Sequence, residues 1–61
     1  MKPTCKLLGE DGNIFNLLGI ASKTLKKCDR TEEAKDMTQR VMASGSYSEA
    51  LRIIAEYVEI E

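Results

Sequence analysis

The residues best suited to chemistry gather in the stretch GEDGNIFNLLG, residues 9–19, where oxygen-bearing side chains precede an apolar segment. Four oxygen donors of the kind that Ca²⁺ or Mg²⁺ prefers fall here: Glu10, Asp11, Asn13 and Asn16. A helix-loop-helix calcium site, however, needs oxygens at alternating positions over about twelve residues and a closing bidentate Glu. This chain is already apolar at Ile14. The spacing therefore favours a turn followed by a helix, and we expect no metal site.

An anion site is a second possibility for the same stretch, because amides after Gly12 would point outward at the positive end of a helix. The chain has neither G-x-G-x-x-G nor G-x-x-x-x-G-K-[ST], the two glycine-rich patterns that cradle phosphates. Glu10 and Asp11 would also repel a phosphate. We expect no cofactor at this position.

Groups able to catalyse a reaction are scarce. The chain has no His, which removes the commonest general base and metal ligand. Of its two cysteines only Cys28 has basic neighbours, Lys26 and Lys27, that could activate a thiolate. Cys28 also falls on an apolar helical stripe, so we expect both Cys28 and Cys5 to act as small buried hydrophobic residues. We predict no catalytic residues and no enzyme activity.

The charges nearly cancel, with nine basic and ten acidic residues and a net charge of −1. This balance is unlike the broad basic surface of most nucleic-acid-binding proteins. One basic cluster could still contact phosphates as part of a helix-turn-helix: Lys23, Lys26, Lys27 and Arg30. The last expected helix is acidic, however, and lysines near a helix end also complement the helix dipole. A nucleic-acid-binding regulator is therefore the alternative function, and a solvated helix end is the favoured interpretation of the cluster.

The first half of the chain reads as a strand, a turn and a helix. Residues 4–10 have the composition of a short strand that ends at Gly9. In the turn DGN, Gly12 can take a positive φ and Asn13 can cap the helix that begins at Ile14. Apolar residues then recur at helical spacing, namely Ile14, Leu17, Leu18, Ala21, Leu25 and Cys28. Gly19 lies inside this helix, which suggests that another backbone packs closely against it.

Two further helices are expected in the second half. Asp29 or Thr31 could cap the first of them, which runs to about Ser44 before Gly45 ends it. Its buried side would comprise Ala34, Met37, Thr38, Val41 and Met42. Ser46 and Glu49 form a capping box for a third helix. The alternation in YVEIE, residues 57–61, then predicts a short C-terminal strand that pairs with the N-terminal one.

These elements predict a single small α+β domain over residues 1–61, with three helices packed together and one or two short strands. No apolar run approaches the length of a membrane span, and we expect a cytoplasmic protein. A core of this size without disulfides often gains stability by self-association. We therefore expect a homodimer that acts as a non-enzymatic protein-protein interaction module. Ile20, which the first helix cannot bury alone, and Ile53 and Tyr57 in the third are the candidate interface residues.

The order of segments resembles a group of very small bacterial, phage or mobile-element proteins of uncharacterised function. The likeness is carried by GEDGNIFNLLGIASKTLKK, by SYSEAL and by the terminal YVEIE, and it covers nearly the whole chain. These segments are structural. The resemblance implies a compact cytosolic α+β domain, an accessory role beside a mobile element, and no catalytic residues.

Overall fold

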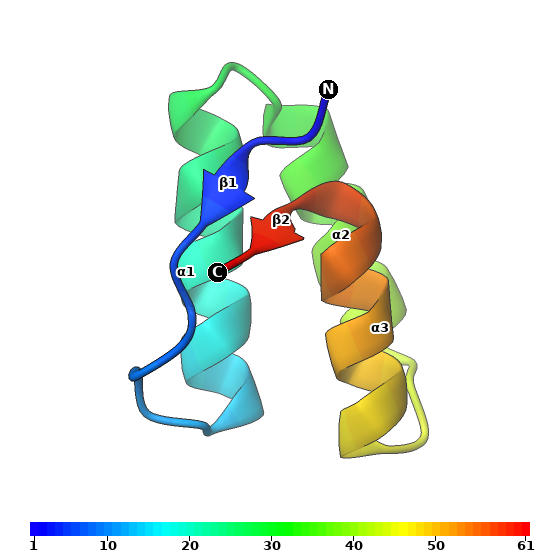
Figure 1. Ribbon diagram of the computed structural model, residues 1–61. Helices are drawn as coiled ribbons and strands as arrows, with labels where there is room; N and C mark the ends of the chain where they lie inside the picture. The colour runs from blue at the N-terminus through cyan, green and yellow to red at the C-terminus, as the bar shows by residue number, and fades with distance from the viewer.

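Three helices and two very short strands make up the fold, which a computed structural model describes for all residues 1–61. The elements follow in the order β1 (Thr4–Cys5), α1 (Ile14–Lys27), α2 (Thr31–Met42), α3 (Tyr47–Tyr57) and β2 (Glu59–Ile60). Successive helices run in opposite directions, as the colour gradient shows (Figure 1). The α+β class and the C-terminal strand are thus confirmed.

The start of α1 is fixed by the local capping that the sequence predicts. The Asn13 side chain accepts a hydrogen bond from the Phe15 amide at 2.9 Å, and the Asp11 carboxylate accepts one from the Asn13 amide at 3.0 Å. Lys26 and Lys27 occupy the last turn, where they complement the dipole. The expectation of a positive φ at Gly12 is wrong, because the chain turns earlier, at Gly9, which has a φ of 90°.

The junction before α2 differs from the expectation. No side chain caps this helix, and Arg30 occupies the cap position. Asp29 instead takes a φ of 63° in the left-handed region, and Thr31 is already the first helical residue. Neither expected cap is therefore correct. The helix also ends at Met42, before the expected Ser44, and Gly45 has no positive φ.

The capping box before α3 is confirmed in its main contact. The Ser46 hydroxyl accepts a hydrogen bond from the Glu49 amide at 3.1 Å. The Glu49 carboxylate reaches back one residue further than expected and accepts from the Gly45 amide at 3.4 Å. Both bonds satisfy amides at the turn between α2 and α3, which fixes where α3 begins.

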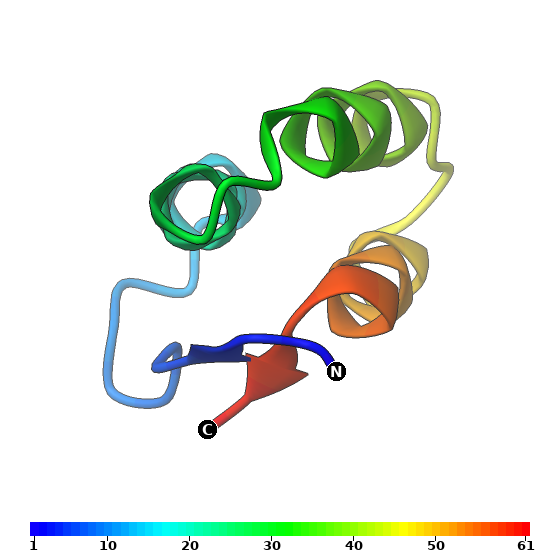
Figure 2. The same ribbon diagram turned by 90° about the horizontal axis from the view of Figure 1, so that it is seen from above.

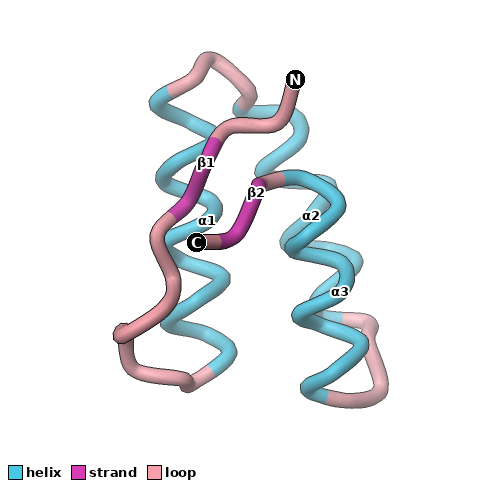
Figure 3. The backbone as a smooth tube through the Cα atoms, in the orientation of Figure 1, coloured by secondary structure: helices cyan, strands magenta, loops and turns pink.

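The two strands form a parallel pair with Thr4 opposite Glu59 and Cys5 opposite Ile60 (Figure 3). The Glu61 amide donates to the Cys5 carbonyl at 2.9 Å, and the Glu61 carbonyl accepts from the Leu7 amide at 2.7 Å. The N-terminal strand is shorter than the expected residues 4–10. Beyond it, the Leu7 and Leu8 amides both donate to the Glu61 carbonyl, and Gly9 then turns the chain.

Seen along the helices, α1, α2 and α3 occupy three corners, and the strands close the side between α1 and α3 (Figure 2). The centre is filled by one cluster of 14 buried apolar residues. Its largest fully buried side chains come from β1, the three helices and the residue between α3 and β2: Cys5, Leu25, Met37, Ile54 and Val58. The apolar residues of α3 are thus used inside the chain, against α1 and α2.

Two expectations about α1 are wrong. Cys28 is exposed, because α1 ends at Lys27 and the chain leaves the helical path there. Gly19 is also exposed, and a Cβ built on it would meet nothing within 4 Å. No neighbouring element therefore packs closely against Gly19.

Candidate functional site

Large apolar side chains are exposed at the end of the bundle where α1 begins, α2 ends and α3 begins. Phe15 and Met42 are each 62% exposed, and Tyr47 is 48% exposed. The three helix ends lie together at the bottom of Figure 1. Single exposed apolar residues are ordinary, but three large ones on adjoining elements are a feature that calls for an explanation.

These three side chains line a hollow of about 330 Å³, which we call the end hollow. Its lining also includes Ile14 from α1 and Ala50 from α3. Ala50 is buried and Ile14 is half-buried. The hollow is therefore an apolar depression with large apolar side chains around it.

A second hollow of about 320 Å³ also has Tyr47 in its lining, and we call it the strand hollow. Leu7, Leu17, Leu51 and Ile60 contribute to its apolar lining. Leu8, which is 73% exposed, lines it as well. Tyr47 is the one residue that lines both hollows.

The Tyr47 side chain is held in place between the hollows. Its hydroxyl donates a hydrogen bond to the Gly12 carbonyl, which ties the start of α3 to the loop before α1. A tyrosine fixed at its tip still presents its ring, and a ring that is already ordered loses little conformational entropy when a partner covers it. We use the name apolar face for Leu8, Phe15, Met42 and Tyr47 with the two hollows.

The apolar face lies in the part of the chain that is poorest in charge. Charged residues make up 31% of the sequence, yet residues 12–22 and residues 41–48 contain none. The first stretch supplies Phe15, and the second supplies Met42 and Tyr47. Glu10 lines the strand hollow and is the one charged residue among the linings of the two hollows. The local composition thus matches the centre of protein interfaces, where aromatic residues and Met are enriched and charges are depleted.

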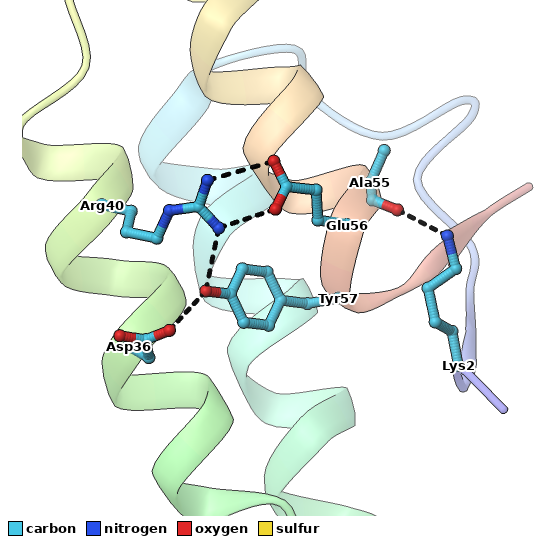
Figure 4. Close-up of polar contacts among 6 residues, drawn as sticks. All are labelled: Lys2, Asp36, Arg40, Ala55, Glu56 and Tyr57. Atoms are coloured by element: carbon cyan, nitrogen blue, oxygen red, sulfur yellow. Dashed lines mark hydrogen bonds and ion pairs between the residues drawn. The ribbon is translucent and has the colours of Figure 1, made fainter.

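A polar cluster joins α2 to α3 on a different side of the bundle (Figure 4). The Arg40 guanidinium donates to both carboxylate oxygens of Glu56, at 2.8 and 3.1 Å. It also donates to the Tyr57 hydroxyl at 3.1 Å, and that hydroxyl donates to the Asp36 carboxylate at 2.6 Å. These contacts join Asp36 and Arg40 of α2 to Glu56 and Tyr57 of α3, so the cluster ties the two helices together.

The same contacts shift the ionisation of their members. The hydrogen bond to Asp36 raises the pKa of the Tyr57 phenol, because ionisation would break that bond, while the bond from Arg40 opposes the shift. The hydrogen bond from Arg40 lowers the pKa of Glu56, and the bond to Glu56 raises the pKa of Arg40. Arg40 and Tyr57 therefore stay protonated and Glu56 stays ionised near neutral pH, which suits a structural clamp.

The basic cluster lies at the opposite end of α1 from Phe15. Lys23, Lys26 and Lys27 are exposed. Arg30 is used inside the chain, since its guanidinium donates to the Met1 carbonyl at 2.7 Å and lies 3.7 Å from Glu33. The nucleic-acid alternative thus rests on the three exposed lysines.

The expected interface residues are taken up by the chain's own packing. Ile53 is 7% exposed and Tyr57 9%, and both belong to the buried cluster. Ile20 is half-buried and packs against the same cluster. Ile53 and Tyr57 therefore offer little surface to a partner, while Ile20 keeps part of its side chain exposed.

The residues of the apolar face were not singled out from the sequence. Met42 was expected on the buried side of α2 and Leu8 in a strand, and Phe15 was not among the residues of the α1 stripe. The signal that could have found Phe15, Met42 and Tyr47 is the absence of charge in residues 12–22 and 41–48. Apolar residues in a charge-free stretch that lie off a helical stripe are candidates for an exposed contact surface.

Comparisons with known protein families, with curated proteins and with solved structures gave no match. None of the three helices has the length and apolar character that a membrane crossing requires. No three His, Cys, Asp or Glu side chains lie close enough together to hold a metal ion. The function of the chain therefore has to be inferred from its own residues.

Proposed function

We propose that this chain is a non-enzymatic protein-protein interaction module that self-associates through the apolar face. The observation that carries the proposal is the exposure of Phe15, Met42 and Tyr47 together around one apolar hollow. Covering such side chains is favourable by about 25 cal/mol for each Å² of apolar surface removed from water. Exposed apolar patches on small domains mark contact sites for this reason.

The size of the chain supports self-association. A standard interface takes about 800 Å² from each partner. The whole chain exposes 4051 Å², so such an interface would cover about a fifth of its surface. A core of 14 buried residues without a disulfide gives a small domain limited stability, and association adds to it. The net charge of −1 leaves little repulsion between copies.

We further propose a cytoplasmic location and an accessory role beside a mobile element. The cysteine content of the sequence, two thiols without the spacing of a disulfide framework, supports the location. The resemblance to small mobile-element proteins supports the accessory role.

Sedimentation equilibrium over a wide range of protein concentration tests self-association. We expect the apparent mass of the wild-type chain to rise from 6.8 kDa towards twice that value as concentration increases. Phe15→Ser should shift this rise to higher concentration, because it removes an exposed apolar side chain without opening the core. Lys23→Ser, on the same helix but away from the apolar face, is the matched control and should behave as wild type. A strict monomer up to millimolar concentration would contradict the proposal.

A further inference from the structure

We propose that Asp11 and Gly12, in the loop before α1, form a site of spontaneous covalent modification at which the folded protein converts Asp11 to isoaspartate. The Gly12 amide nitrogen attacks the carboxyl carbon of the Asp11 side chain, and a five-membered succinimide ring closes. Water then opens the ring and leaves the main chain running through the Asp11 side chain. This inference goes beyond the proposed function and does not depend on self-association.

The reaction needs only water as a co-reactant. A bond forms between the Gly12 nitrogen and the Asp11 Cγ, the amide proton passes to water, and one carboxyl oxygen leaves as water after protonation. Hydrolysis adds a water molecule back to the ring. Attack on the carbonyl carbon next to the Asp11 Cα gives isoaspartate, while attack on Cγ returns aspartate. The product therefore has the same mass as the parent chain.

The sequence offers this reaction one favourable place. Gly12 is the one glycine in the chain that follows an Asp or an Asn. Glycine has no Cβ to shield its amide nitrogen, and its backbone turns freely towards the geometry of attack. The other two aspartates are followed by Arg30 and Met37, whose Cβ atoms hinder the same approach.

The structure leaves the Gly12 amide free and engages the amides that follow the other two aspartates. Gly12 is exposed, and its amide donates no hydrogen bond within the protein. The amide after Asp29 donates to the Leu25 carbonyl at 2.8 Å, and the amide after Asp36 lies inside α2. A bonded amide has to give up its hydrogen bond before its nitrogen can attack. Asp11 is thus the one aspartate whose following amide is ready to react.

The Asp11 side chain is turned towards the residues that follow it. Its carboxylate accepts a hydrogen bond from the Asn13 amide at 3.0 Å, so this bond closes a short loop. That loop contains the two atoms that have to meet, the Asp11 Cγ and the Gly12 nitrogen. Reacting groups that are already held close together lose little further freedom when a ring closes.

Modification would loosen the start of α1 and the contact that holds Tyr47. The Asp11 carbonyl accepts a hydrogen bond from the Asn16 side-chain amide at 3.0 Å, and the Gly12 carbonyl accepts one from the Tyr47 hydroxyl. In isoaspartate the first of these carbonyls becomes a free carboxylate, and the link to Gly12 gains one carbon atom. The two contacts cannot both keep their geometry, so we expect a lower Tm for the modified chain.

Ageing the full chain in neutral buffer tests the proposal, at low protein concentration because Gly12 also lines the strand hollow. Trypsin then releases residues 7–23, and we expect a second form of this peptide with unchanged mass and a different retention time. A methyltransferase specific for isoaspartate should label that form. Gly12→Ala is the matched control and should lose most of the label. Its Cβ would meet only the Tyr47 hydroxyl, at an ordinary 3.6 Å, so the variant should fold.

The rate of labelling in urea, below the unfolding transition, shows which state of the chain reacts. A reaction in the folded loop should keep its rate, because local opening does not follow global stability. A rate that rises in step with the unfolded fraction would place the reaction in the unfolded chain and overturn the proposal. Equal labelling of Gly12→Ala, or label in peptides that contain Asp29 or Asp36, would overturn it as well. None of these outcomes bears on self-association.

Discussion

Replacing Gly19 by Ala should stabilise the protein. Gly19 lies in the interior of α1, is exposed, and has nothing within 4 Å of the position where a Cβ would be added. The substitution therefore introduces no clash, and the full difference in helix propensity between Gly and Ala applies, about 0.8–1.0 kcal/mol. In a domain of this size that gain corresponds to a rise in Tm of about 4–8 °C.

Gly9→Ala is the matched control, with the same chemical change and the opposite expected sign. Gly9 also has open space around it, but its φ of 90° is one that residues with a Cβ rarely adopt. We expect a loss of about 1–2 kcal/mol from this strain. Thermal and urea unfolding followed by circular dichroism measure both variants, at one protein concentration because association also stabilises the fold. A lower Tm for Gly19→Ala would refute the reasoning, since it would mean that a neighbour packs against Gly19.

Three more outcomes follow from the burial and the contacts of single side chains. One thiol, Cys28, should react with a maleimide in the native protein and Cys5 only after unfolding, so rapid loss of both thiols would contradict their placement. Because the pKa of Tyr57 is raised in the folded state, the stability that its hydroxyl contributes should be constant below the unfolded pKa of about 10 and be lost as pH rises further. The stability difference between wild type and Tyr57→Phe, measured by urea unfolding from pH 8 to pH 11.5, should therefore shrink above pH 10, and a growing difference would be inconsistent with the bond to Asp36. Leu25→Ala, at a fully buried position, should lower the free energy of unfolding by about 2–5 kcal/mol in the same assay, and a smaller loss would mean that the site collapses around the cavity.

The parts of the fold that depend on residues close together in the sequence were predicted well. Asn13 caps α1 and Ser46 caps α3 because the bonds they make reach only two or three residues along the chain. The stripe from Ile14 to Leu25 likewise follows from helical spacing alone. The C-terminal strand was predicted from the alternation of apolar and polar residues in 57–61, and it pairs with β1.

Features that depend on how the helices dock were predicted less well. Met42 is exposed because α2 turns the side that carries Ala34, Met37 and Val41 towards the core. The apolar stripe of α2 has few members, so the sequence alone does not show which apolar residues at its margin stay exposed. Gly19 lies roughly 140° from the centre of the α1 stripe at 100° per residue, so its position on the helix could have excluded close packing. Its residue type suggested a contact that its position on the helix rules out.

The candidate site was the hardest part to predict, because it is made by segments far apart in sequence. Ile53 and Tyr57 were expected to contact a partner, whereas both are packed into the chain's own core. Phe15 and Met42 come from elements whose relative position is set only by tertiary packing. Composition could have helped here, since charge is absent from both stretches that meet at this end.

The most direct test of self-association through the apolar face is a series of ¹H–¹⁵N correlation spectra of the wild-type chain recorded at increasing concentration. We expect the amide signals of residues 12–16 and 41–48 to move or broaden as copies associate. The signals of residues 23–30, at the opposite end of α1, should stay where they are. Spectra that do not change with concentration, or changes confined to residues 23–30, would contradict the account.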